Sequence, residues 1–176
     1  MFLNPAVEAD FPAIVELANL AYRGSGASAS WNSEAGLIEG PRLTESLLKH
    51  DLAVTPEAHL LTYRDRDQPN GQLLGTVWLE PKPDGIWYLG LLTIRPELQS
   101  RQLGRTLLAA AEGFAKQRGA RRMRMTVINL RGTLIEWYRR RGYVLTGETK
   151  PFSYGDERFG KPLRDDLYFE VLEKDL

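Results

Sequence analysis

The stretch LGLLTIRPELQSRQLGRTLL, residues Leu89–Leu108, decides how this chain folds. An apolar segment that ends at Ile94 runs into a polar turn, Gln99–Gly104, and an Ala/Leu-rich segment with helical spacing follows at once. The first N–H groups of a helix have no partner within it, and the helix dipole is positive at that end. Arg101 and Arg105 add positive charge there. The stretch therefore predicts a strand, a turn and a helix N-terminus that bind a phosphorylated ligand.

The motifs around this turn narrow the kind of ligand. The chain has no G-x-x-x-x-G-K-[ST] and no G-x-G-x-x-G after a strand, so an ATP-type or dinucleotide site is not supported. The hexapeptide QSRQLG (Gln99–Gly104), preceded by LTIRP (Leu92–Pro96), resembles motif A of the GNAT superfamily of N-acetyltransferases, usually Q/R-x-x-G-x-G/A. Gln102 stands where that motif has its first glycine.

The resemblance implies that acetyl-CoA is the acyl donor and that its pyrophosphate lies on the backbone N–H groups of the turn. It also implies that the pantetheine arm pairs with the preceding strand where that strand separates from the next. The implied contacts with acetyl-CoA are Leu92, Thr93, Ile94, Gln99, Ser100, Arg101, Gln102, Leu103, Gly104, Arg105, Thr106, Asn129 and Tyr138.

The composition indicates one globular domain, residues 1–176, with 43% apolar and 26% charged residues. Twenty-three basic and 23 acidic residues cancel, which argues against nucleic acid or an anionic membrane as a partner. Cysteine is absent, which excludes disulfides, thiolate nucleophiles and cysteine-ligated metals. Because no apolar run approaches the ~20 residues of a membrane span and the first residues do not resemble a signal peptide, we expect a cytoplasmic protein.

Hydrophobic periodicity predicts the other elements of the chain. Helices are expected from Asp10, as N-cap, to Tyr22, and at Thr44–Lys49, Leu103–Gln117 and Thr133–Arg141. Strands are expected at Phe2–Pro5, His59–Arg64, Gln72–Glu80, Ile86–Ile94, Met123–Val127, Tyr143–Thr146 and Leu167–Leu172. Asn70-Gly71 and Asp84-Gly85 predict tight hairpins between the three middle strands.

These elements predict an α/β fold with a mixed sheet, in which an antiparallel meander is followed by a βαβ crossover and helices cover both faces. Ile86–Ile94 is apolar on both sides and is expected at the centre of the sheet. Strict alternation along it places Leu92 and Ile94 on the face opposite to Trp87 and Leu89. The element order β-α-α-β-β-β-α-β-α-β-β is similar to that of the GNAT fold, so the resemblance covers essentially the whole chain.

The segment EWYRRRGY (Glu136–Tyr143) resembles the Tyr-x-x-x-Gly-aromatic signature of the same family. By this resemblance Tyr138 is the general acid that gives a proton or a hydrogen bond to the departing CoA thiolate. A phenol with a pKa of ~10 keeps its proton at neutral pH. Tyr138 also lies four residues after Leu134 and fits a core-facing aromatic residue. Asn129 similarly fits either a family cofactor contact or an ordinary turn at a strand end.

The implied reaction is a direct attack of a primary amine on the thioester, polarised by a strand N–H near Ile94. The amine must lose a proton, and Glu80, at the end of the strand before the central one, is the preferred base. Glu34 and Glu39 are alternatives, and each of the three also fits a solvated charge. No metal is expected, because the two histidines lack supporting ligands. The alternative function is a non-catalytic module that binds acyl-CoA as a sensor or scaffold.

Two long segments rich in aromatic and acidic residues, Gly24–Arg42 and Lys150–Asp166, are candidates for the acceptor site. Trp31, Glu34 and Tyr154 are the predicted substrate-binding residues. Aromatic rings together with carboxylates suit a small cationic amine. The sequence leaves open a peptide N-terminus, a lysine, a polyamine, an amino acid or an aminoglycoside-like compound as acceptor, and the same aromatic residues fit a homodimer contact or plain loop packing.

Overall fold

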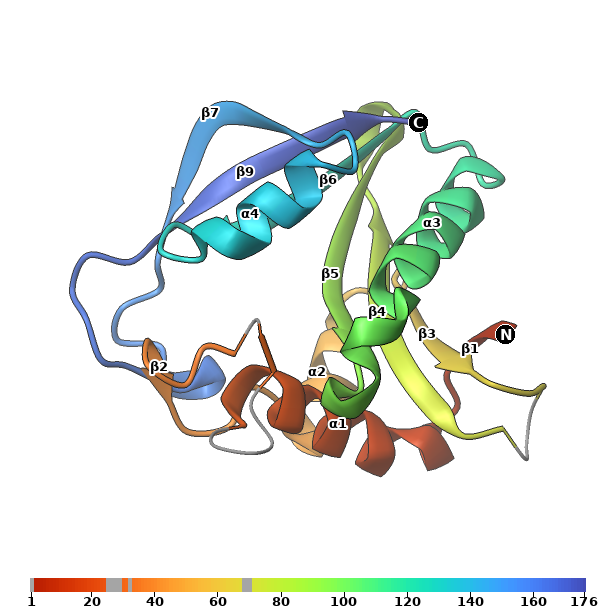
Figure 1. Ribbon diagram of the computed structural model, residues 1–176, viewed down its shortest axis with the longest axis horizontal. Coiled ribbons are helices and arrows are strands. Elements are labelled where there is room, and N and C mark those ends of the chain that lie inside the picture. The colour runs from red at the N-terminus through yellow and green to blue at the C-terminus, as the bar shows by residue number, and fades with distance from the viewer. Residues whose placement is uncertain (1, 25–29, 32, 68–70) are drawn as a thin grey trace.

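The computed structural model describes residues 2–24, 30–31, 33–67 and 71–176, which form a seven-stranded sheet with helices on both faces (Figure 1). The strand order is β1-β3-β4-β5-β6-β9-β7. These strands are β1 (Phe2–Pro5), β3 (His59–Arg64), β4 (Leu73–Pro81), β5 (Ile86–Ile94), β6 (Arg122–Ile128), β7 (Val144–Pro151) and β9 (Tyr168–Asp175). The α-helices are α1 (Phe11–Arg23), α2 (Glu45–Val54), α3 (Leu103–Lys116) and α4 (Gly132–Arg139).

The topology is the one predicted from the sequence. β3, β4 and β5 form an antiparallel meander, and α3 carries the chain to β6, which pairs with β5 in parallel. β5 is the fourth of the seven strands, so its central position is confirmed. A small second sheet, β2 (Ile38–Glu39) with β8 (Lys161–Pro162), was not predicted and joins the two long loops.

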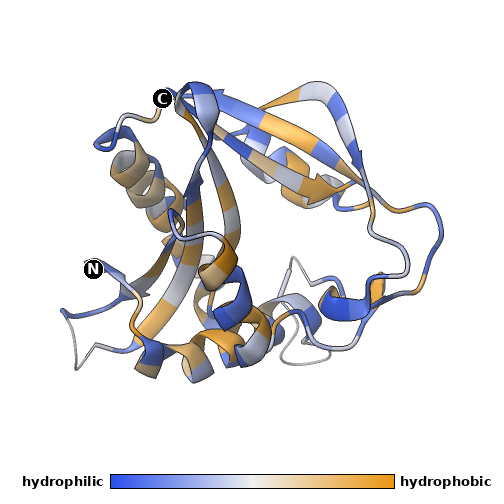
Figure 2. Cartoon of the chain, turned by 180° about the vertical axis from the view of Figure 1, so that it is seen from behind, coloured by the Kyte–Doolittle hydropathy of each residue, from blue (hydrophilic) through white to orange (hydrophobic). Residues whose placement is uncertain are grey.

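Two hydrophobic clusters lie on opposite faces of the sheet. α3 and α4 bury Leu107, Ala111 and Leu134 against one face, and α1 and α2 bury Ile14 and Leu48 against the other. In Figure 2 hydrophobic and hydrophilic residues alternate along helices and strands, as amphipathic elements require. Within the described residues, no helix has the length and hydrophobicity needed to cross a lipid bilayer.

A β-bulge interrupts β5. The pairing advances by two residues on β4, from Thr76 to Trp78, but by three on β5, from Thr93 to Gly90. Leu91, within the bulge, has a φ of +50°, a conformation that costs a leucine on the order of 1–3 kcal/mol. The backbone beside Leu91 lies outside the regular ladder with β4, and the Leu91 carbonyl accepts from the Thr93 hydroxyl at 3.0 Å instead.

The bulge overturns the face assignment made from strict alternation. Trp87 and Leu89 pack in the cluster under α3, and Leu92 and Ile94 pack in that same cluster. Leu91 packs toward α1 on the other face. One inserted residue therefore turns the end of β5 back toward α3, because side chains alternate with a period of two.

β5 and β6 are paired at one end only. Ile86–Tyr88 pairs with Arg122–Arg124, after which β5 continues to Ile94 and β6 to Ile128. β6 stays paired with β9 along its whole length. The sheet is therefore divided beyond Tyr88, with β1, β3, β4 and β5 on one side and β6, β9 and β7 on the other, as Figure 1 shows.

Some predicted boundaries are wrong. Thr44 is the N-cap of α2, with its hydroxyl accepting from Leu47 N at 3.2 Å, but the helix continues past Lys49 to Val54. The strand expected to end at Thr146 continues to the end of β7. Gly147, which directly follows Thr146 and has a φ of +81°, marks an irregularity in the pairing of β7 with β9 and not the end of the strand.

The predicted turns and caps have mixed outcomes. Asp84 and Gly85 both have positive φ in the tight hairpin between β4 and β5, as an Asp-Gly turn requires. Asn70 of the other predicted hairpin lies outside the described residues. Asp10 directly precedes α1 but does not cap it with its side chain, because its carboxylate forms a buried ion pair with Arg64 at 2.6 Å.

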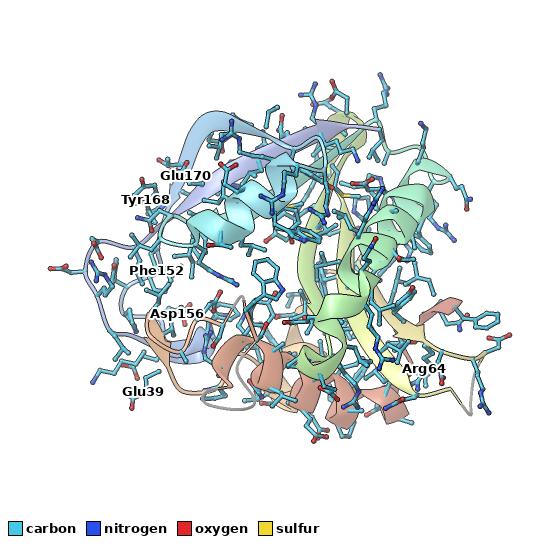
Figure 3. All side chains as sticks on the ribbon, viewed as in Figure 1. Glu39, Arg64, Phe152, Asp156, Tyr168 and Glu170 are labelled. Carbon is cyan, nitrogen blue, oxygen red and sulfur yellow. The ribbon has the colours of Figure 1, made fainter. Side chains whose placement is uncertain are left out.

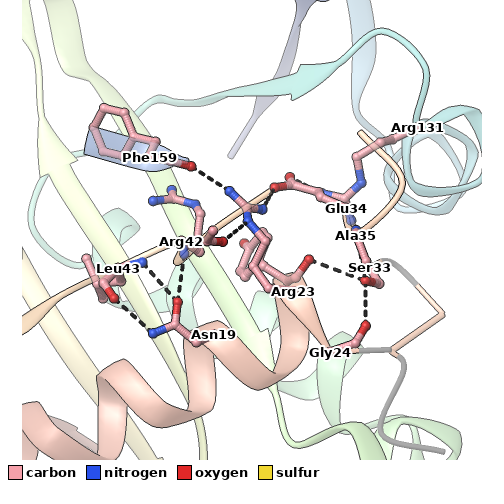
Figure 4. Close-up of polar contacts among 12 residues, drawn as sticks. Asn19, Arg23, Gly24, Ser33, Glu34, Ala35, Arg42, Leu43, Arg131 and Phe159 are labelled. Carbon is pink, nitrogen blue, oxygen red and sulfur yellow. Dashed lines mark hydrogen bonds and ion pairs between the residues drawn. The ribbon is translucent and has the colours of Figure 1, made fainter. Parts of the chain in front are cut away.

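A buried ion-pair cluster, formed by Arg23, Glu34 and Arg131, ties the first long loop to the sheet (Figure 4). One carboxylate oxygen of Glu34 accepts from Arg23, and the other accepts from Arg131 at 2.7 Å. Arg23 also donates to the carbonyl oxygens of Gly40 at 3.0 Å and Phe159 at 2.6 Å. This Glu34 cluster connects α1, the start of α4 and both long loops.

We expect Glu34→Gln to lower the free energy of unfolding by about 3–5 kcal/mol, because two buried guanidinium groups lose their carboxylate. Chemical denaturation followed by circular dichroism measures this change. Glu136→Gln, which removes an exposed ion pair with Arg139, serves as the control and should cost less than about 1 kcal/mol. Equal stabilities of the two variants would contradict a structural role for the Glu34 cluster.

Gln102 precedes α3 with a φ of +59°, where the family motif has glycine. Glycine adopts this conformation without steric cost, so Gln102→Gly should raise the free energy of unfolding by up to about 1 kcal/mol. Gln117→Gly, at the other end of α3 with a φ of −61°, should instead lower it by roughly 0.5–1 kcal/mol. Thermal and urea unfolding of both variants test the difference. A destabilised Gln102→Gly would mean that side-chain contacts of Gln102 outweigh the backbone strain.

Candidate active site

Two cavities lie along the region where β5 and β6 separate. The large cavity has a volume of about 450 Å³ and lies between β4, β5, β6, α1 and the two long loops. The small pocket, about 70 Å³, lies at the N-terminus of α3. Leu92, Leu134 and Tyr138 line both. The bulged end of β5 and the inner face of α4 are therefore the place where molecules in the two cavities would meet.

The small pocket has the properties of an anion site. The N–H groups of Leu103, Gly104 and Arg105 open α3 and have no acceptor among the described residues. Arg105 and Arg141 line the pocket, and no acidic side chain among its described lining residues opposes them. A Cβ at Gly104 would lie 3.5 Å from Trp137, so glycine keeps space open above these amides. Free N–H donors and positive charge together favour a phosphate group.

Gln99 ties this turn to the first long loop. Its Nε2 donates to Ser30 Oγ at 2.6 Å, and its Oε1 accepts from Trp31 N at 3.4 Å. The side chain of Trp31 consequently lies against Trp137, with 6.3 Å between the ring centroids, and lines the small pocket. Trp31 was predicted to bind the acceptor, and the structure places it in the lining of the small pocket and not in that of the large cavity.

From the sequence, Arg139–Arg141 fits either a solvated helix end or a contact with the 3′-phosphate of CoA, and the structure places Arg141 in the lining of the small pocket. Its guanidinium lies 3.6 Å from the ring centroid of Trp137 and donates to the Trp137 carbonyl at 2.6 Å. Its Nε is buried without a hydrogen-bond partner. Burial, and then repulsion by Arg140 and Arg105, lower the pKa of Arg141. The four-residue spacing from Trp137 is the signal that predicts such stacking.

The strand residues predicted to contact the cofactor have different surroundings. Leu92 and Ile94 line the small pocket. Thr93 is buried, and its hydroxyl donates to the carbonyl of Leu91 at 3.0 Å. Leu103 is buried in the core under α3, so only its backbone faces the pocket region. Contacts made through this strand and turn therefore depend mainly on backbone groups.

The remaining predicted cofactor residues lie at the edge of the site or outside it. Arg101 and Thr106 are exposed beside the turn, and the side chain of Ser100 is outside the described part of the structure. Asn129 lines neither cavity. Its Oδ1 accepts from Tyr168 N at 3.1 Å, and its Nδ2 donates to the carbonyl of Asp166, also at 3.1 Å. The amide of Asn129 is thus occupied in holding the start of β9.

Tyr138 lies between the two cavities. It is 6% exposed, and its ring packs edge-on against Trp137 and Tyr143, with centroids 5.0 and 5.6 Å away. Its hydroxyl makes no hydrogen bond with any described side chain. Burial raises the pKa of Tyr138, and the nearby Tyr22 phenol raises it further, which outweighs the opposite effect of Arg131. The phenol is therefore fully protonated at neutral pH. The position of Tyr138 fits both predictions made from the sequence, a core-facing aromatic residue and a residue of the active site.

The carboxylates considered as bases are mostly engaged. Glu80 lines the large cavity opposite Tyr88 on β5, and its carboxylate forms an ion pair with Lys82. Glu34 lines the same cavity, but both of its oxygens are held in the Glu34 cluster. Glu39 lies in β2 and is exposed outside the cavity. Asp51 of α2 also lines the cavity, and burial raises its pKa; it was missed because the helix was predicted to end before it.

The two predicted acceptor loops both border the large cavity. Ile38 and Arg42 line it from the first loop, and Phe152 and Asp156 line it from the second. Figure 3 shows Phe152 and Asp156 on this second loop. Tyr154 was predicted to bind the substrate, but it is 45% exposed and does not line the cavity, because its hydroxyl accepts from the backbone N–H of residue 167 at 2.8 Å. No cluster of three or more metal-ligating side chains occurs in the part of the chain that the structure describes.

Comparison with solved structures identifies proteins of similar fold. The ribosomal-protein-alanine N-acetyltransferase from Brucella melitensis is 18% identical, with full coverage of both chains and a TM-score of 0.68. The PaiA N-acetyltransferase from Thermoplasma acidophilum, solved in complex with coenzyme A, is 17% identical over 99% of this chain and 98% of that one, with a TM-score of 0.68. Identities this low show a shared fold. No curated protein sequence is significantly similar to this chain.

Comparison with models of protein families identifies the family of this chain. A family model described as "Acetyltransferase (GNAT) family" matches residues 15–143. The matched segment includes the bulged strand β5, the turn before α3, and α4 with Tyr138. It covers well over half of the 176 residues. The chain therefore belongs to the acetyltransferase (GNAT) family.

Proposed function

We propose that the protein transfers an acetyl group from acetyl-CoA to a primary amine by direct attack. The observation that carries this proposal is that Leu92, Leu134 and Tyr138 line both cavities. A donor in the small pocket and along β5 would present its thioester to an amine in the large cavity. Holding two reactants in register in this way supplies much of the rate enhancement of a two-substrate reaction.

The small pocket supports acetyl-CoA as the donor. Its free helix N–H groups, together with Arg105 and Arg141, suit the diphosphate of CoA. The backbone near Leu91 supports an extended pantetheine arm, which would pair with β5 as an added strand. The N–H expected to polarise the thioester near Ile94 lies in the paired part of β5, opposite Gly75. We therefore assign this role to the backbone at the bulge, which lies outside the ladder.

The reaction requires that the amine lose one proton and that the leaving thiolate gain one. The raised pKa of Tyr138 makes full proton transfer to a thiolate with a free pKa near 8.5 unfavourable, whereas a hydrogen bond from the phenol stabilises the developing charge. We assign Tyr138 to this task. Glu80 is the proposed base for the amine, directly or through water, and it must exchange its contact with Lys82 for one with the acceptor.

A module that binds acyl-CoA without turnover is the competing function. The ion pair on Glu80 favours it, because the carboxylate that would accept the proton of the amine is already in contact with Lys82. Release of thiol from acetyl-CoA in the presence of an amine panel separates the two functions. Binding of CoA without thiol release from any amine would support the non-catalytic module.

We expect Gly104→Val to weaken CoA binding by about 100-fold or more, because its methyl groups occupy the space above the helix N–H groups and remove charge-assisted hydrogen bonds. Calorimetry with CoA measures the affinity. Gly113→Val, in the same helix at a position with no neighbouring atoms within 4 Å, is the control and should bind CoA normally. Equal affinities of these two variants, or no binding by the wild type, would exclude the pocket as the donor site.

We expect Tyr138→Phe to lower kcat by about 100-fold or more while CoA affinity is retained, because only the hydroxyl is removed. Tyr143→Phe removes a neighbouring hydroxyl that donates to Glu112 at 2.9 Å and should lower stability without a comparable loss of kcat. Since burial raises the pKa of Tyr138, the wild-type rate should not fall through its ionisation up to pH 10. An unchanged kcat in Tyr138→Phe, with chemistry rate-limiting, would leave Tyr138 with a packing role only.

A further inference from the structure

The sequence predicted a cationic acceptor from the carboxylates of the two long loops, but most carboxylates that line the large cavity already have a cationic partner. Four acidic residues line it, Glu34, Asp51, Glu80 and Asp156. Glu34 is held in the Glu34 cluster, and Glu80 is paired with Lys82. Both carboxylate oxygens of Asp156 accept from its neighbour two residues later, at 2.6 to 3.0 Å. Three of the four carboxylates therefore already have a cationic partner, and Asp51 alone has no ion pair with a described residue.

Arg42 is the available cation of this cavity. Its guanidinium makes no hydrogen bond or ion pair with any described residue, although the residue lines the cavity. It lies 5.4 Å from the ring centroids of both Tyr22 and Phe159. Contact with two aromatic faces stabilises the planar cation and leaves its N–H edge free to bind an anion.

The backbone of Arg42 is fixed by Asn19 of α1 (Figure 4). The Oδ1 of Asn19 accepts from Arg42 N at 2.7 Å and from Leu43 N at 3.1 Å, and its Nδ2 donates to Leu43 O at 2.9 Å. A guanidinium held by its backbone and by two rings loses little freedom on binding a ligand. Arg42 is thus a preorganised site for a planar anion such as a carboxylate.

The unpaired charges of the lining describe the ligand further. Glu34 occupies both Arg23 and Arg131, and Glu80 and Asp156 pair with cations outside the lining, which leaves Arg42 and Asp51 without an ion pair among the described residues. The single unpaired cation and the single unpaired carboxylate match a molecule that carries both a carboxylate and an amine. A diamine or a simple amine matches only the unpaired carboxylate.

We infer that the acceptor is a small amino acid with an apolar side chain, whose carboxylate binds Arg42. This inference rests on the proposed acetyl transfer and names its substrate class. The apolar lining residues Trp78, Phe152 and Phe169 suit the side chain, and a volume of about 450 Å³ is in the range of small-molecule sites. The carboxylate on Arg42 leaves the amine of the same molecule free to extend toward Leu92 and Tyr138.

The experiment compares acceptors that differ only in the carboxylate. L-Phenylalanine and L-leucine are assayed by thiol release from acetyl-CoA beside their carboxamides and the corresponding decarboxylated amines. Wild type, Arg42→Gln and Arg42→Lys are compared, with Arg118→Gln as control, because Arg118 also stacks on a ring, that of Phe114 at 3.5 Å, away from the cavity. Ratios between acceptors are compared across variants, so that the different pKa values of the amines cancel.

We expect Arg42→Gln to lower kcat/KM for the amino acids by about ten-fold or more, because a charge-assisted hydrogen bond is lost. For the amines and carboxamides, kcat/KM should stay within about two-fold of the wild-type value. Arg42→Lys should recover part of the loss, and Arg118→Gln should behave as wild type. The inference is overturned if Arg42→Gln reduces all three classes equally, or if the wild type acetylates only compounds without a carboxylate.

A binding measurement separates this inference from the proposed function. N-Acetyl-L-phenylalanine and its carboxamide are titrated into CoA-saturated protein by calorimetry. Binding of the acid that requires Arg42, without thiol release from any amine, would support the inference about the cavity and refute acetyl transfer. Thiol release with simple amines, without Arg42-dependent binding of the acid, would support acetyl transfer and refute the inference. Failure of the N-acetyl acid to bind, together with failure of the free amino acids to react, would refute it as well.

Discussion

The extra residue in β5 is the constraint on which the rest of the site depends. A bulge bends its strand and breaks the regular ladder. In this chain the bend lies beyond Tyr88, where β5 has already parted from β6. The same residue turns Leu92 and Ile94 toward α3 and leaves the backbone at Leu91 outside the pairing with β4. The strain of a leucine at positive φ persists because packed clusters on both faces hold the strand.

The parts of the fold that were predicted correctly are those encoded in local periodicity. The strand, turn and helix of Leu89–Leu108, the meander and the Asp84-Gly85 hairpin each follow from residues close in sequence. The bulge in β5 does not follow from neighbouring residues, because its position depends on which residues of β4 pair with β5. The small sheet of β2 and β8 joins residues more than a hundred positions apart, and strands of two residues carry no periodic signal.

The same distinction applies to the site. The turn residues Gln99–Gly104 were found because a helix N-terminus and its motif are contiguous in sequence. Asp51 was missed because the helix that carries it was predicted to end at Lys49. Arg42 was missed because its lack of an ion pair depends on how charges distant in sequence pair with one another. Glu34 shows the reverse case. Its residue type suggested a free carboxylate, but two arginines from α1 and from the segment before α4 occupy both of its oxygens.

Burial at the junction of the two cavities has two opposed consequences for the proposed reaction. It removes water from the place where a thioester would meet an amine, which strengthens electrostatic interactions there. It also raises the pKa of Tyr138, so that the phenol is a hydrogen-bond donor and a poor source of a transferable proton. A thiolate stabilised by Tyr138 would then take its proton from solvent as CoA leaves. The proton lost by the amine would then need its own acceptor, and Glu80 and Asp51, which both line the large cavity, are the candidates.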